Sequence, residues 1–286
     1  MEQKKNTIKT DEAWSRLHAR LEEEHLLPRT ENGGIVHGKL LLKWGAVAAV
    51  FLGMIYCAAL WMTPSPQKNA RNLIMQQNSE KATLVKTLED GSIVYLAQRS
   101  TLLYPEHFAA DKREVNLQGE AFFDIAPQKE QSFLIETGKV RVEVLGTAFD
   151  VRSNESTSFS LSVQRGMVKV MLRQDGHTLL ARAGETIFLQ DGELHRGETV
   201  SSGYFDRYTK NIRFKDELLE NVLRAVNRES AGTQVVTNSA VLNKKRLTVE
   251  FSDYSPESVA ELICWTYGLN CVRRGNRLIL EPAPTH

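Results

Sequence analysis

The feature that most constrains this chain is an uncharged apolar run, Trp44–Met62 (WGAVAAVFLGMIYCAALWM). A helix of this length spans about 28 Å, close to the thickness of the hydrocarbon core of a bilayer. Aromatic residues lie near its ends, and Pro64 and Pro66 follow it. A buried core helix and a signal peptide are the alternatives, but the run is uniformly apolar and begins more than forty residues into the chain. The sequence therefore predicts a membrane-spanning helix over residues 42–62.

This run divides the chain into a short head, residues 1–39, and a long tail that begins at residue 63. The formal net charge of +1 gives no support for a nucleic-acid or polybasic membrane partner. Basic residues flank the run almost equally, and only Lys39 and Lys43, directly before it, favour a cytoplasmic head. In the tail, Cys264 and Cys271 either form a disulfide in an oxidising compartment or are small buried thiols.

The head has the pattern of one short amphipathic helix. Thr10-Asp11-Glu12 is typical of a helix start, and Trp14, Leu17 and Leu21 then form an apolar stripe at helical spacing. A head of this size cannot bury the stripe in a core of its own. We expect the stripe to bind a partner protein, because the opposite face mixes acids and bases. A helix lying on the membrane surface is the alternative.

Residues 84–200 change to a period of two, with glycine-containing turn pairs at short intervals. This pattern predicts about ten to twelve short strands and no long helix, as in an antiparallel β-sandwich or roll. Residues 63–83 are expected to be a linker and the start of this part. The predicted fold class is therefore mainly β, with a single transmembrane helix before the sandwich and a small α+β part after it.

Three segments of this part carry a family resemblance: Thr87–Leu96 (TLEDGSIVYL), Leu117–Ile125 (LQGEAFFDI) and Val144–Val151 (VLGTAFDV). Their order and spacing resemble the periplasmic domain of FecR-type regulators, the anti-sigma factors of cell-surface signalling. From the residues themselves, we expect Gly119 and Gly146 to turn the chain where a side chain would clash. Two acids of the second segment, Glu120 and Asp124, are either a catalytic carboxylate pair or, as we expect, ordinary charges of a strand edge.

Residues 204–286 contain an internal repeat at an offset of 37 residues, in which Phe214 aligns with Phe251 and Asp216 with Asp253. Each copy predicts a strand, a helix and a strand, and a closing strand follows at residues 277–281. The predicted ranges are 211–214, 218–227 and 234–237, then 246–251, 256–267 and 271–273. Two such βαβ units resemble the C-terminal domain of long FecR-type proteins. Their sheet edge either accepts a strand from a partner or is covered by the closing strand.

The resemblance also implies a cleavage step, because some FecR-type proteins are cut without a protease at a Gly-Thr pair in this place. In this chain the pair is Gly146-Thr147. The threonine hydroxyl would attack its own preceding carbonyl carbon, and water would open the resulting ester. The alternative is that Gly146 serves a turn and Thr147 begins the next strand.

The sequence contains no recognisable catalytic motif and no metal-ligand spacing, so we expect neither an enzyme nor a cofactor. The resemblance implies a single-pass anti-sigma factor of the bacterial inner membrane, with its N-terminus in the cytoplasm. Trp14, Leu17 and Leu21 would bind an extracytoplasmic-function sigma factor that controls nutrient-uptake genes. The periplasmic C-terminal domain would bind the signalling domain of a TonB-dependent outer-membrane transducer. A membrane-anchored periplasmic enzyme or an envelope-assembly factor is the alternative.

Overall fold

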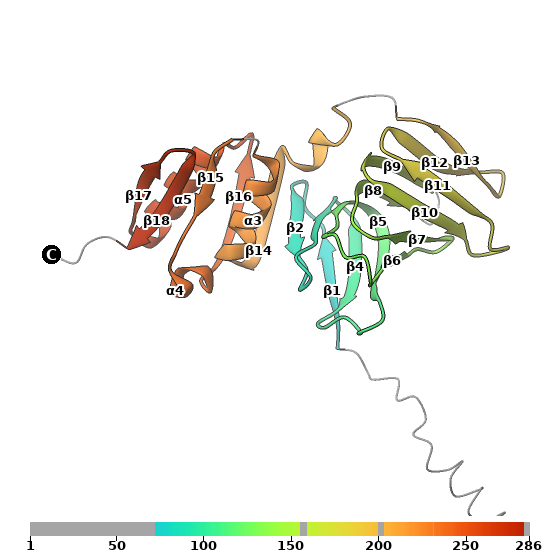
Figure 1. The fold of residues 1–286 in the computed structure, drawn as a ribbon, viewed down its shortest axis with the longest axis horizontal. Coiled ribbons are helices and arrows are strands. Elements are labelled where there is room, and N and C mark those ends of the chain that lie inside the picture. The colour runs from blue at the N-terminus through green and yellow to red at the C-terminus, as the bar shows by residue number, and fades with distance from the viewer. Residues whose placement is uncertain (1–71, 155–158, 200–202, 231, 283–286) are drawn as a thin grey trace, which may run out of the picture. The chain divides into compact units, whose positions relative to one another are not determined.

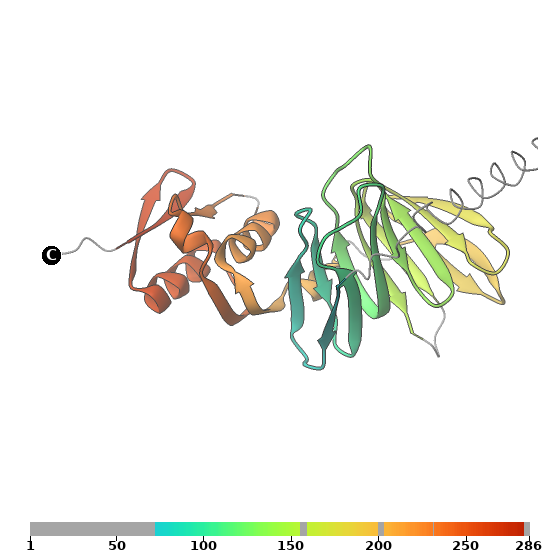
Figure 2. The same ribbon diagram turned by 90° about the horizontal axis from the view of Figure 1, so that it is seen from below.

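Alternating apolar and polar residues form a β-sandwich between residues 73 and 198 (Figures 1 and 2). The structure, a computed structural model, describes residues 72–154, 159–199, 203–230 and 232–282, all within one compact unit of residues 68–286. The sandwich strands are β1 (Leu73–Asn78), β2 (Thr83–Thr87), β3 (Ile93–Leu96), β4 (Ser100–Pro105), β5 (Arg113–Asp124), β6 (Phe133–Glu136), β7 (Val140–Val144), β8 (Ala148–Ser153), β9 (Ser160–Arg165), β10 (Met167–Leu172), β11 (Thr178–Arg182), β12 (Glu185–Gln190) and β13 (Glu193–Glu198). The prediction of a mainly β, sandwich-like fold is confirmed, and the first strand begins before residue 84.

Strand β5 belongs to both layers of the sandwich, and it changes layer at Gly119. Its first half pairs with β4 and, in parallel, with β6, whereas its second half pairs with β3 and β8. Gly119 has a φ of 101°, and a Cβ atom there would lie 2.5 Å from Ser100 Oγ. Glycine tolerates both the backbone angle and the close approach. The expectation that Gly119 turns the chain where a side chain would clash is confirmed.

The main hydrophobic core lies between the two layers. It includes Phe123, Phe133 and Phe149, and the rings of Phe123 and Phe149 stack with their centroids 5.6 Å apart. Because successive residues of a strand face opposite sides, Phe122 points away from this core and into a second one. The C-terminal part of the chain supplies most of that second core.

The C-terminal part is drawn in orange to red in Figure 1. Its elements are the 3-10 helix η1 (Asp206–Tyr208), β14 (Asn211–Leu218), α3 (Leu219–Glu229), β15 (Gln234–Val236), α4 (Ala240–Asn243), β16 (Arg246–Ser252), α5 (Pro256–Tyr267), β17 (Leu269–Arg274) and β18 (Arg277–Pro282). Helices α3 and α5 begin at the repeat offset, at residues 219 and 256. Asp216 and Asp253 share a positive φ, 49° and 43°, which is uncommon outside glycine. The alignment of the two copies is therefore matched by the backbone.

The predicted βαβ units are wrong in one respect, because the two strands of each copy lie in different sheets. The equivalent strands β14 and β16 pair with each other, and β14 also extends the sandwich sheet by pairing with β2. Strands β15 and β17 both pair with β18 in a separate three-stranded sheet. A repeat in sequence specifies the order of its elements, whereas packing between the copies decides which strands pair.

Two predictions fall on the first part of the chain. Within the described residues, no helix is both long enough and apolar enough to cross a membrane. The predicted span over residues 42–62, the head and its stripe of Trp14, Leu17 and Leu21 all lie outside the described residues. Their roles therefore stay predictions, and the site described below is built from the tail alone.

Candidate functional site

The C-terminal part packs on the face of strands β2, β3, β5 and β8 that points away from the main core. We call this contact the docking interface. It combines a short parallel pairing, with Ile212 beside Thr83 and Arg213 beside Leu84, and the second hydrophobic core. The sandwich residues in that core are Val85, Ile93, Tyr95, Phe122 and Ala148. The sandwich and the C-terminal part thus share one sheet and one core.

Phe122 is the aromatic centre of the docking interface. Its ring lies 5.7 Å from that of Tyr208 at an interplanar angle of 22°, and 5.6 Å from that of Phe205. Tyr95, on the neighbouring strand β3, lies 5.6 Å away on the sandwich side. Three such ring pairs each contribute about 0.5–1.5 kcal/mol beyond the burial of apolar area. Phe122 therefore attaches the segment around η1 to β5.

Asp124, the last residue of β5, joins the sandwich to helix α3. Its buried carboxylate accepts a hydrogen bond of 2.8 Å from Arg165 of β9 and also pairs with Arg228, in the last turn of α3. A carboxylate this deeply buried is stable only when its charge is paired. The charge of Asp124 is therefore shared between two guanidinium groups, and one of them belongs to the C-terminal part.

Glu120, four residues earlier on β5, joins the sandwich to the 3-10 helix η1. One of its oxygens lies 2.7 Å from the Tyr208 hydroxyl and 2.7 Å from a guanidinium nitrogen of Arg207. Arg207 also donates to the Tyr208 hydroxyl at 2.6 Å. The structure therefore places Glu120 and Asp124 in separate ion-pair networks of the docking interface, which corrects our expectation of ordinary strand-edge charges.

Asp150 of β8 is fully buried, and its carboxylate joins the same network. One oxygen accepts the backbone N–H of Ser162 at 3.0 Å. The other accepts the Tyr204 hydroxyl at 3.0 Å and lies 3.2 Å from the Arg207 guanidinium. Burial raises the pKa of Asp150 above its usual value, and Arg152 together with the tyrosine hydroxyls opposes that rise. Our sequence reading missed this residue. The aromatic-rich run Tyr204–Tyr208 (YFDRY), which supplies the partners of Asp150, is the sequence feature that could have pointed to this network.

The Gly146-Thr147 pair lies just before β8, pressed against the loop that follows β5. A Cβ atom at Gly146 would lie 2.6 Å from Pro127 Cα, so the expected steric need for glycine is confirmed. The carbonyl of Thr147 accepts the N–H of Ile125 at 2.9 Å, which holds the pair in place. The Thr147 side chain is buried, and its hydroxyl has no hydrogen-bond partner among the described residues. The cleavage chemistry and the simple turn therefore both stay predictions.

Comparison with known proteins identifies the sandwich. Residues 77–169 match the sequence model of the FecR protein family. The chain contains a FecR domain. The chain also matches two crystal structures of a proposed anti-sigma factor from Parabacteroides distasonis, at 2.50 and 1.65 Å. Each has 22% sequence identity and a TM-score of 0.45, and each alignment covers 74% of this chain and 100% of the other. No curated protein sequence matches this chain.

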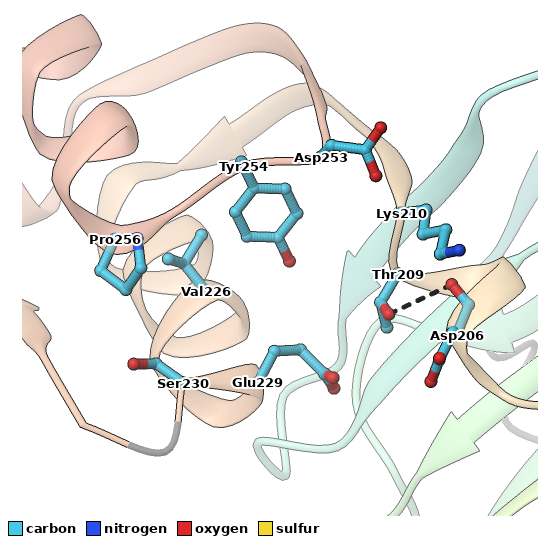
Figure 3. A pocket seen from close by; sticks show the side chains of 9 residues that line it. All are labelled: Asp206, Thr209, Lys210, Val226, Glu229, Ser230, Asp253, Tyr254 and Pro256. Atoms are coloured by element: carbon cyan, nitrogen blue, oxygen red, sulfur yellow. Dashed lines mark hydrogen bonds between the residues drawn. The ribbon is translucent and has the colours of Figure 1, made fainter. Parts of the chain in front are cut away.

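A cavity of about 410 Å³ lies beside the docking interface, between η1, the end of α3 and the start of α5. In Figure 3 the Tyr254 ring and the Glu229 carboxyl group face the same open space. Tyr95, on β3 of the FecR domain, donates a hydrogen bond of 3.4 Å to Glu229. Burial, and next the negative charge of Asp124, raise the pKa of Glu229. The ionised form of this carboxyl group is therefore disfavoured in the folded protein.

Helix α5 presents an apolar patch on the outside of the C-terminal part. Trp265 is 88% exposed, and Leu262, one turn earlier, is also exposed. The adjacent strand β17 is an edge of the three-stranded sheet, since β18 lies between it and β15. The closing strand pairs with β17 on one side and leaves its other side without a described partner. The α5 patch and this edge together are a candidate surface for a partner protein.

The two cysteines of the C-terminal part are free thiols. Cys264 is buried in α5, and Cys271 is exposed on β17. Burial, and next the neighbouring Cys271, raise the pKa of the Cys264 thiol to about 11. A thiol with this pKa stays protonated and unreactive at neutral pH. Of the two predicted small buried thiols, only Cys264 is buried, and the structure has no disulfide between the two residues. Within its described residues, no cluster of His, Cys, Asp or Glu is arranged to hold a metal ion.

Proposed function

We propose that this chain is a transmembrane anti-sigma factor of the bacterial inner membrane. In this proposal the apolar run crosses the membrane once. The cytoplasmic head holds an extracytoplasmic-function sigma factor through Trp14, Leu17 and Leu21. The tail lies in the periplasm and receives a signal from a TonB-dependent outer-membrane transducer, which leads to expression of nutrient-uptake genes.

The observation that carries the proposal is the FecR domain at residues 77–169, which lies after an uncharged run long enough to span a bilayer. The docking interface adds a physical route for the signal. Phe122, Asp124 and Asp150 tie the C-terminal part to the FecR domain, and buried residues of α5 lie in the same second core. We infer that force or strain applied to α5 would pass through this core to the sandwich. From there it would reach β1, which residues 63–72 connect to the predicted membrane span.

The sigma-binding role is tested by substitution in the head. Truncating a buried aromatic anchor at an interface commonly costs about 2–4 kcal/mol. Trp14→Ala should therefore release the sigma factor and raise transcription of its target genes without inducer, and a pull-down with residues 1–39 should lose the sigma factor. Glu23→Ala, on the opposite face of the predicted helix, is the matched control. Full repression by Trp14→Ala at normal abundance would place the contact elsewhere.

The membrane topology is tested separately. Alkaline phosphatase fused after residue 200 should be active, because the enzyme matures only outside the cytoplasm. An inactive fusion, combined with an active cytoplasmic reporter at the same position, would reverse the orientation.

The transducer contact is best tested with a point variant. Deleting residues 204–286 would expose Phe122 and remove the partners that Asp150 and Asp124 have in the C-terminal part, so it would damage the FecR domain as well. Trp265→Ala removes an exposed ring and leaves the core intact. We expect it to abolish induction by the extracellular signal while repression persists. Val241→Ala, at another exposed apolar position of the C-terminal part, should respond normally.

A further inference from the structure

Within the part of the chain that the structure describes, strand β1 is an edge strand with no strand paired to its outer side. Among the described strands it pairs only with β4, over six residues without a register shift. Three successive side chains are exposed on it: Leu73 by 54%, Ile74 by 38% and Met75 by 68%. Natural edge strands usually carry a charge, a proline or a bulge that prevents pairing with another chain. The segment Asn72–Asn78 (NLIMQQN) has none of these.

We propose that β1 pairs with β1 of a second copy of this chain, antiparallel and centred on Ile74. About a two-fold axis, each residue before Ile74 lies opposite the residue equally far after it. Leu73 then meets Met75 of the second copy on one face, and the two Ile74 side chains meet on the other face. Asn72 lies opposite Gln76. This register covers all three exposed apolar side chains and pairs polar residues with polar residues.

The length of the preceding chain fits this arrangement. Residues 63–72 separate the apolar run from β1, and ten extended residues reach at most about 33 Å. In the proposed register the two Leu73 residues are two positions apart along the strands, about 7 Å. Both preceding segments therefore start from nearly the same place and can return to one membrane. Anchoring in that membrane, which is part of the proposed function, would raise the local concentration of the second copy. The strand pairing itself does not require it.

A lipid surface is the less suitable occupant of this edge. The free side of an edge strand carries backbone N–H and C=O groups that need hydrogen-bond partners, and the hydrocarbon region of a bilayer has none. A second strand satisfies these groups and covers the apolar side chains at the same time. The observations therefore favour strand pairing.

Cysteine cross-linking in membranes containing the full chain tests both the contact and its register. Residues directly opposite in an antiparallel pair have Cβ atoms about 4.5–5.5 Å apart, so Ile74→Cys should give a reducible dimer under mild oxidation. Gln77→Cys is the matched control on the same strand, because in this register its two copies are six positions, about 20 Å, apart. It should give no more dimer than the wild type, which measures the background from the native cysteines. No added dimer with Ile74→Cys, or equal dimer with Gln77→Cys, would overturn the proposal.

A second substitution separates a specific contact from chance collision. Met75→Lys, introduced together with Ile74→Cys, places an ammonium group opposite Leu73 of the second copy. We expect at least a tenfold loss of cross-linked dimer. The side chain of Met75 is largely exposed, so the fold should persist, and an unchanged circular dichroism spectrum would check this. Unchanged cross-linking would refute the pairing. Sigma binding by the head is measured independently, so failure of either claim leaves the other standing.

Discussion

Replacing Phe122 by alanine should detach the C-terminal part from the FecR domain. The side chain is buried, and it contacts three aromatic rings at centroid distances of 5.6–5.7 Å. Phenylalanine-to-alanine substitutions at such positions cost about 3–5 kcal/mol, and we expect a value in the upper half of this range because two of the rings lie across the interface. A domain with a typical stability of about 5–15 kcal/mol would remain folded under native conditions.

Phe123→Ala is the matched control, because the next residue of β5 has the same side chain on the opposite face. Phe123 is buried in the main core against Phe149. Urea unfolding of residues 68–286 should show a similar loss of stability for both variants. Hydrogen exchange followed by mass spectrometry should distinguish them. Phe122→Ala should accelerate exchange in η1, β14 and α3, whereas Phe123→Ala should accelerate exchange in β6 and β7, inside the sandwich.

Two results would refute this reasoning. A cost below about 1 kcal/mol for Phe122→Ala would mean that the ring is not buried in an interface. Faster exchange in β6 and β7 than in α3 for the same variant would mean that Phe122 supports the sandwich core and does not hold the C-terminal part in place.

Three further predictions concern single residues. Arg228→Ala should cost about 2 kcal/mol, less than the usual cost of breaking a buried pair because Arg165 still compensates Asp124; Lys244→Ala, on the exposed end of α4, should be neutral in the same urea titration. Burial raises the pKa of Glu229 above its ordinary value of 4.5, so the folded protein binds the carboxyl proton more tightly than the unfolded chain does. Stability therefore falls as the pH rises from the pKa of the unfolded chain through that of the folded protein. Glu229→Gln should therefore melt higher than the wild type at pH 7 and equally at pH 4. If Gly146-Thr147 is the cleavage step that the resemblance implies, purified wild type and Thr147→Ser should run as two fragments and Thr147→Ala as one; full-length wild type would exclude cleavage.

Much of the local structure could be predicted from the sequence, because local patterns carry it. The period-two alternation indicated the strands, and the offset of 37 residues indicated two equivalent copies. Their helices were predicted to begin at residues 218 and 256, and they begin at residues 219 and 256. The predicted start of α5 at residue 256 was correct. The structure shows a local cause, because Ser255 caps the helix and Pro256 is its first residue, and both act within one turn. The need for glycine at residues 119 and 146 could also be predicted from the motif in which each occurs.

Only the tertiary structure decided what the acids of the FecR motifs do. Glu120, Asp124 and Asp150 find their partners in Arg207, Tyr208 and Arg228, between 57 and 104 residues later. No local periodicity links positions so far apart, because such pairs form only when two separately patterned segments pack together. The same reason explains the error in the βαβ prediction. The alternation of β5 shows that Phe122 and Phe123 face opposite sides, but only packing shows that one side is the sandwich core and the other is the docking interface.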